Sequence, residues 1–194
     1  MPTASRKIIA CYLRSSSALL DDHILNRLAA RFAPQDKDNR EPVVHVELFF
    51  PNEDNPEHGV SAGIHYGGQM FMHPKRFHRK DWTFQSIPAT ETQVSRAKQF
   101  CERQKGASFN HVGFFMPGMC NLGHAYRERH LAVKKMPWYC SELVAYALMH
   151  AGIIDSRCAK IARVHPQHVY DILQDNCSVY VDCARSFRDT SLDL

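Results

Sequence analysis

The hydrophobic and polar residues alternate most regularly over residues 43–50 (VVHVELFF), where every second side chain is apolar. Because successive side chains of a strand point to opposite faces, this pattern places one apolar set on a buried face. That set is Val44, Val46, Leu48 and Phe50, and the other face carries Val43, His45, Glu47 and Phe49. Shorter runs predict further strands at residues 7–13, 60–66, 69–72 and 111–116.

Apolar residues recur with a helical period in four other segments. These segments are residues 18–32, 91–104, 140–150 and 166–174. Ser17 is a candidate N-cap for the first, and Gly106 and Gly152 are placed to stop the second and third. Helices on both sides of a strand-rich middle predict an α+β fold with an antiparallel sheet. The length of 194 residues suits a single domain spanning residues 1–194.

The stretch PNEDNPEHG at residues 51–59 is dense in turn-forming residues and predicts a hairpin. If the hairpin is centred near Asn55, His65 lies opposite His45 and Gly63 lies opposite Glu47. Residues paired across antiparallel strands share a face, so two histidines and a carboxylate would gather there. A slip of one residue would turn the second strand over. The plainer interpretation is a solvent-facing strand, where His and Glu are commonplace.

Composition narrows the classes of partner. The chain is 44% hydrophobic and 23% charged, with a formal net charge of +4, and Lys and Arg are scattered among Asp and Glu. We therefore expect no nucleic-acid partner, and we interpret the basic stretch KRFHRK at residues 75–80 as a solvated loop rather than a binding module. No apolar run is long enough for a signal peptide or a membrane span.

The seven cysteines are odd in number, far apart and without a CxxC pair. That pattern favours reduced thiols in an intracellular, cytoplasmic protein over a disulfide framework. A zinc site would have to combine single residues distant in sequence, such as Cys158, His165 and Cys177. We therefore expect no metal and no other cofactor.

Cys140 is placed in the first turn of the helix expected at 140–150, on its apolar stripe. Most buried cysteines are small core residues, and that is the simpler interpretation. A helix N-terminus, however, stabilises a thiolate and can hold the oxyanion formed when a thiolate attacks a carbonyl. Such a nucleophile needs an imidazole to accept its proton, and His45 on the adjacent strand is the natural candidate.

Four segments together resemble the circularly permuted NlpC/P60 papain-like superfamily. They are the His strand HVEL at 45–48, the segment GASFN at 106–110, the helix start YCSELV at 139–144, and VHP at 164–166 leading into a helix. The resemblance covers residues 43–173. Relatives include bacterial YiiX-like and poxviral proteins and, more distantly, the lecithin:retinol acyltransferase group. A viral member would work in the host cytoplasm.

The resemblance implies a thiol hydrolase that cleaves a peptide, isopeptide or acyl-lipid bond through an acyl-enzyme. Cys140 would match the nucleophile and His45 the general base. The third, orienting group is His65 by position or Glu47 by chemistry, with His73 as a further choice. The sequence CSELV differs from the Asn-Cys-Glu-His pattern of the acyltransferase group, which argues against a lipid acyltransferase. The alternative is an inactive or regulatory protein of the same fold that binds a host or cellular partner. The oligomeric state stays open.

Overall fold

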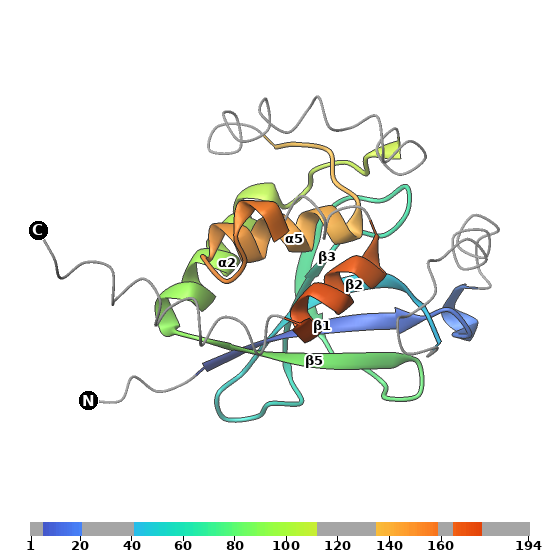
Figure 1. Ribbon diagram of the computed structural model, residues 1–194, viewed down its shortest axis with the longest axis horizontal. Coiled ribbons are helices and arrows are strands. Elements are labelled where there is room, and N and C mark those ends of the chain that lie inside the picture. The colour runs from blue at the N-terminus through green and yellow to red at the C-terminus, as the bar shows by residue number, and fades with distance from the viewer. Residues whose placement is uncertain (1–5, 21–40, 112–134, 159–164, 176–194) are drawn as a thin grey trace, which may run out of the picture.

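The computed structural model describes residues 6–20, 41–111, 135–158 and 165–175. Its elements, in chain order, are β1 (Arg6–Arg14), the 3-10 helix η1 (Ala18–Leu20), β2 (Val43–Pro51), β3 (Gly59–Gly63), β4 (Phe71–Lys75), β5 (Trp82–Ala89), α2 (Glu91–Gln104) and α5 (Cys140–His150). Residues 166–175 form one more helix. In Figure 1, α2 and α5 lie on one side of the strands.

The five strands form one sheet in the order β4-β3-β2-β1-β5, and every neighbouring pair is antiparallel. The expected α+β class with an antiparallel sheet is therefore confirmed. The sequence pattern did not predict β5. This strand carries Pro88, which cannot donate to a ladder on both sides, and it accordingly lies at the edge of the sheet.

The β2–β3 hairpin has the expected register. Leu48 pairs with Ala62 and Phe50 with Val60, so the hairpin is centred on Asn55. The returning strand is shorter than the expected 60–66 and ends at Gly63. The chain then turns, with the Gly68 N–H donating to the His65 carbonyl and Gly67 at a φ of 69°. The next strand consequently runs over Phe71–Lys75 rather than 69–72.

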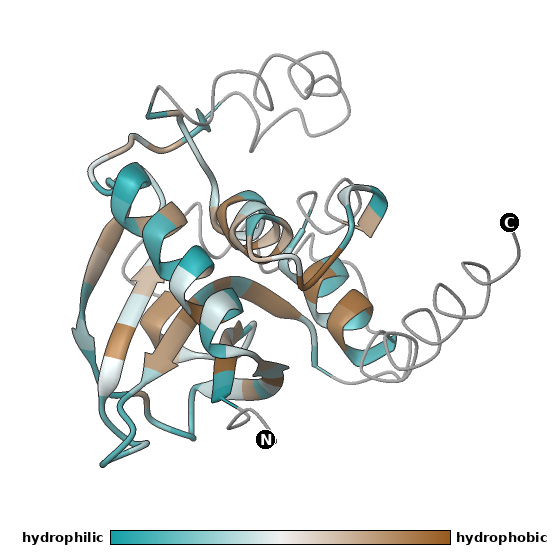
Figure 2. Cartoon of the chain, turned by 90° about the vertical axis from the view of Figure 1, so that its left-hand side faces the viewer, coloured by the Kyte–Doolittle hydropathy of each residue, from teal (hydrophilic) through white to brown (hydrophobic). Residues whose placement is uncertain are grey.

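The main core fills the space between the sheet and helices α2 and α5. Val46, Leu48 and Phe50 contribute to it from β2, as expected. Val44 does not, because the pairing steps from Leu13–His45 to Arg14–Val43, which leaves Val44 as the extra residue of a bulge in β2 and turns it to the other face. Val43 takes its place in the main core. Figure 2 shows strands that are hydrophobic over much of their length beside a largely hydrophilic α2.

A second apolar cluster lies on the opposite face of the sheet. Its buried members are Cys11, Leu13, Leu20, Phe49 and Trp82. Glu47 shares this face, since it pairs with Cys11 across the β1–β2 ladder, and its side chain is 0% exposed. The interpretation of the odd-numbered face of β2 as solvent-facing is therefore wrong. A carboxylate held inside the protein needs specific partners.

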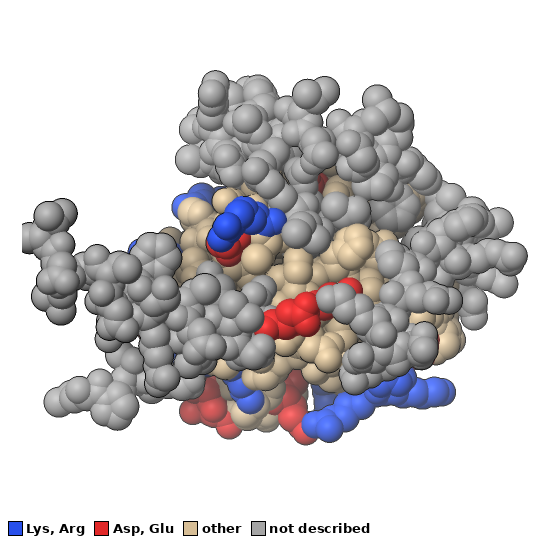
Figure 3. All heavy atoms as spheres, in the orientation of Figure 1, with Lys and Arg blue, Asp and Glu red and all other residues tan. Residues whose placement is uncertain are grey.

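The bounds of α2 and α5 match the expected helices. Thr90 caps α2 through a capping box with Gln93, and α5 ends before Gly152, which has a φ of 71°. Only Ala18–Leu20 of the expected helix 18–32 is described, and the expected strand 111–116 lies outside the described residues beyond His111. Within the described segments, no helix is long and apolar enough to cross a membrane. Figure 3 shows charges of both signs on one face.

Candidate active site

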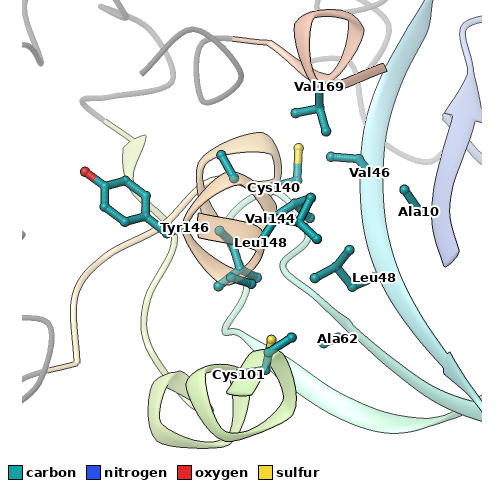
Figure 4. Packing of buried hydrophobic residues seen from close by; sticks show 14 of the residues in the cluster. Ala10, Val46, Leu48, Ala62, Cys101, Cys140, Val144, Tyr146, Leu148 and Val169 are labelled. Carbon is teal, nitrogen blue, oxygen red and sulfur yellow. The ribbon is translucent and has the colours of Figure 1, made fainter. Parts of the chain in front are cut away.

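Helix α5 delivers Cys140 to the sheet. The N-cap Tyr139 has an extended backbone, and Cys140 is the first helical residue, 8% exposed. Val144 and Leu148 bury the same helix in the main core, and burial of side chains of this size contributes about 1.5–3 kcal/mol each. The sulfur of Cys140 is directed away from the rest of α5, toward Val46 of β2 and Val169 (Figure 4).

His45 lies beside that sulfur because of where β3 ends. The β2–β3 pairing stops at Leu48 and Ala62, before it reaches His45, so this edge of β2 can be approached by other parts of the chain. Helix α5 packs on the face opposite Glu47, and its N-terminus approaches the site at this edge of β2. The Cys140 side chain lies close enough to His45 for its negative charge to raise the pKa of the imidazole.

The imidazole of His45 is held in its protonated form. Burial lowers its pKa, but the negative charge of Cys140, the hydrogen bond to Glu47 and the Glu47 charge together raise it by more. The net result raises the pKa of His45 from 6.5 to about 9. The His45 side chain is 14% exposed, and its ring lies 6.1 Å from that of Trp82, centroid to centroid. His45 thus has the electrostatics of an imidazolium held between Cys140 and Glu47.

Glu47 is the centre of a hydrogen-bond network. Its partners are His45 Nε2 at 3.3 Å, His65 Nε2 at 3.2 Å, Ser61 Oγ at 2.6 Å, and Lys75 Nζ at 2.7 and 2.9 Å. Burial raises the pKa of this carboxyl, yet the hydrogen bonds from the two histidines and the charges of His45 and Lys75 keep it well below its ordinary value. An ionised carboxylate only accepts hydrogen bonds, so each Nε2 carries the proton.

The structure brings His45, Glu47 and His65 together, and Cys140 is close enough to act on the charge of His45. Both candidates for the third group contact the site, Glu47 directly through His45 Nε2 and His65 through Glu47. The rings of His45 and His65 also lie edge to face, 5.3 Å apart. His73 is not part of the cluster, because its ring lies against Phe71 with centroids 4.5 Å apart.

Two members of the network were missed at the sequence level. Ser61 pairs with Phe49, so the register already placed it on the face of Glu47, and that signal was available. Lys75 gave no such signal, because its sequence neighbours form the basic stretch interpreted as a solvated loop. That interpretation is wrong for Lys75, whose side chain is 21% exposed and bonded to Glu47.

His45, Glu47 and His65 also offer ligand atoms within 4.8 Å of one another, a spacing that a metal ion could use. However, the Lys75 ammonium binds both Glu47 oxygens and would have to leave before a cation could bind there. The set therefore fits a hydrogen-bonded carboxylate better than a metal ligand. Of the distant zinc candidates, His165 lies near His168 with ring centroids 6.2 Å apart, and Cys177 lies outside the described residues.

Comparisons of this chain with protein-family models, with curated proteins and with solved structures found no match. Its function is therefore inferred from the chemistry of the site. The site combines a thiol at a helix N-terminus, an imidazole near it and a buried carboxylate bonded to that imidazole, and such groups can carry out nucleophilic chemistry.

Proposed function

We propose that this protein is a cysteine hydrolase of the permuted papain-like type, in which the histidine strand precedes the cysteine helix. The observation that supports it best is the position of His45, which is hydrogen-bonded to the buried Glu47 and has its pKa raised by the nearby Cys140. In this proposal Cys140 is the nucleophile, His45 the acid and base, and Glu47 the group that orients the imidazole. With Nε2 turned to Glu47, Nδ1 is the nitrogen left for the thiol.

In the first half of the reaction the Cys140 thiolate attacks the carbonyl carbon of an amide or ester. A carbon–sulfur bond forms, and the oxyanion develops near the N-terminus of α5, where the positive end of the helix dipole stabilises it. The intermediate collapses as His45 gives its proton to the departing amine or alcohol, whose bond to the carbonyl carbon breaks. The product is a thioester on Cys140.

In the second half water replaces the leaving group. His45, now neutral, accepts a proton from a water molecule as its oxygen attacks the thioester carbon. The carbon–sulfur bond breaks, a carboxylic acid is released, and the thiolate–imidazolium pair is restored. Glu47 keeps the imidazole in one orientation through both halves, and it also stabilises the positive charge that His45 carries.

The substrate is proposed by reaction class as a peptide, isopeptide or acyl ester. The test is a panel of electrophilic probes and fluorogenic substrates representing these three bonds, applied to the full chain. We expect turnover of at least one class in the unsubstituted protein and none in Cys140→Ala. Covalent labelling that is the same at Cys140 as at Cys158 would contradict the proposal and favour a binding protein of the same fold.

A further inference from the structure

The ammonium group of Lys75 is held in an enclosed and specific position. It lies 2.7 Å from Oε1 and 2.9 Å from Oε2 of Glu47, so it engages both carboxylate oxygens. Three aromatic rings surround it, with Nζ-to-centroid distances of 4.7 Å to Phe77, 4.8 Å to Trp82 and 5.9 Å to Phe71. Aromatic faces attract a cation through their ring quadrupole.

Lys75 reaches this position from some distance. It ends β4, the edge strand, and its partner Glu47 lies on β2, two strands away in the sheet order. The long lysine side chain spans that separation on the face shared with the second apolar cluster. Partial burial of an ammonium group is costly unless it gains compensating contacts. The Glu47 carboxylate and the three aromatic rings supply these contacts, so Lys75 is a structural part of the site rather than a solvated surface charge.

The charges around Glu47 show what Lys75 does for its neighbours. In the proposed ion pair Cys140 and His45 carry one negative and one positive charge, and Glu47 adds a second negative charge. Lys75 balances it. Without the ammonium, Glu47 would hold the proton of His45 more tightly, and the whole site would be less favourable to a thiolate. Both effects oppose the proton transfer that the reaction needs.

We propose that Lys75 is a positioning residue of the Cys140–His45 pair, which fixes both Glu47 oxygens and offsets the Glu47 charge. This inference rests on the proposed hydrolase function. It assigns Lys75 a role through Glu47, with no contact to substrate. The aromatic rings of Phe77 and Trp82 hold the ammonium in place for it, and Trp82 also contacts the His45 ring.

The direction of the effect follows from the groups that face Glu47. These are His45 on β2, Ser61 on β3, His65 in the following turn, Lys75 on β4 and Cys11 on β1, whose pKa is raised by burial and by Glu47. His45, His65 and Ser61 still bond Glu47 when Lys75 is gone, so Glu47 stays ionised near neutral pH. Loss of the Lys75 charge therefore raises the pH at which the thiolate forms and the pH at which His45 loses its proton.

The experiment is the pH profile of Cys140 alkylation by iodoacetamide in the full chain, read by mass spectrometry of the Cys140 peptide. The profile has two limbs, one where the Cys140 thiolate forms and one where His45 loses its proton. For Lys75→Met we expect both limbs to move to higher pH by about half a unit or more. Lys75→Arg keeps the charge, so both limbs should stay at their original pH. Lys75→Gln keeps a donor for Glu47 without the charge, so it gives the same upward movement with a smaller loss of stability.

Thr90→Ala is the matched control, because it removes the N-cap of α2 and destabilises the fold at a position outside the site. It should leave both limbs unchanged. If the two uncharged Lys75 variants lose stability while their limbs stay at the original pH, Lys75 is structural only and the proposal is overturned. NMR titration of the His45 ring in a Cys140→Ala background separates the two proposals. An upward shift of the His45 pKa in Lys75→Met supports the role of Lys75 even where Cys140 proves unreactive, and no shift overturns it.

Discussion

Gly63 lies against the Glu47 side chain, and a Cβ atom added to Gly63 would be 2.8 Å from Cγ of Glu47. The ring of Phe71 would be 3.1 Å away on the other side, so neither neighbour leaves space. Glycine at this position is therefore what allows a buried carboxylate to reach His45, Ser61 and Lys75 together. Because the Glu47 side chain is fixed by these partners, it cannot move aside without losing hydrogen bonds.

Gly63→Ala should thus disturb the site by displacing the Glu47 side chain. The added methyl group displaces Glu47, and overpacking of this kind should lower the free energy of unfolding by about 1–3 kcal/mol. We also expect slower alkylation of Cys140, because Glu47 no longer holds His45 in place. Gly68→Ala is the matched control, since its Cβ would only approach the His65 carbonyl oxygen at 3.4 Å. Urea unfolding and iodoacetamide labelling measure the two effects. Equal behaviour of both variants would show that Glu47 has room to move.

Cys140 should alkylate readily at pH 6, where an ordinary thiol is almost wholly protonated. A free thiol titrates at about pH 8.5. We therefore expect Cys140 to react at least roughly 10-fold faster than Cys158 in the same digest. Cys158 is the best reference because it is partly exposed, whereas burial raises the pKa of Cys101 to about 12. His45→Ala should abolish the difference and His73→Ala should not. An unaltered rate in His45→Ala would exclude His45 as the partner.

The His45–Cys140 contact predicts a loss of stability on the alkaline side. The pKa of His45 is raised to about 9 in the folded protein, above the value near 6.5 of an unfolded chain. The folded state therefore binds the proton more tightly. Its stabilising effect is complete below about pH 6.5 and is lost as pH rises through about 9.

At roughly 1.4 kcal/mol per pKa unit this effect amounts to at most about 3.5 kcal/mol. Chemical denaturation at a series of pH values measures it. We expect a smaller decline in Cys140→Ala, because the Cys140 charge is the strongest of the causes that raise the His45 pKa. A decline of the same size in His45→Ala would assign it to another group.

Glu47 predicts the opposite behaviour at acidic pH. Its pKa is held well below the ordinary value, so its contribution is present above about pH 4.5 and is lost as pH falls through the folded-state pKa. Glu47→Ala should cost about 3–5 kcal/mol at neutral pH, because it leaves the Lys75 ammonium without its carboxylate. Glu47→Gln keeps hydrogen bonding and should cost less. Urea midpoints at pH 7 rank the two variants, and a harmless Glu47→Ala would mean that Lys75 finds another partner.

Several parts of the structure follow from local sequence alone. The register of the β2–β3 hairpin is set by the turn around Asn55 and by strict alternation on residues 43–50, both of which are short-range signals. The bounds of α2 and α5 follow from Thr90, the helical period and Gly152. The residue types of the site follow as well, because a thiol at a helix start and a histidine two residues before a glutamate on a strand are visible in the printed sequence.

Other parts depend on partners that the local sequence cannot name. Val44 faces the second cluster because of a bulge in its pairing with β1, a strand that lies far from β2 in the sequence. Strand β5 has Pro88 and exposed positions and becomes a strand by pairing with β1. Lys75 lies in a run of basic residues that resembles any solvated loop, and only the aromatic rings and Glu47 distinguish it from its neighbours.

The choice of His45 among twelve histidines shows the division most clearly. The sequence determined that a cysteine begins α5 and that histidines lie on or near the strands. The tertiary structure decided which histidine the sulfur meets, because β3 leaves the ladder at Ala62 and opens the edge of β2 to α5. Contacts of this kind join segments far apart along the chain. They are set by how the helices pack on the sheet, which no single stretch of sequence encodes.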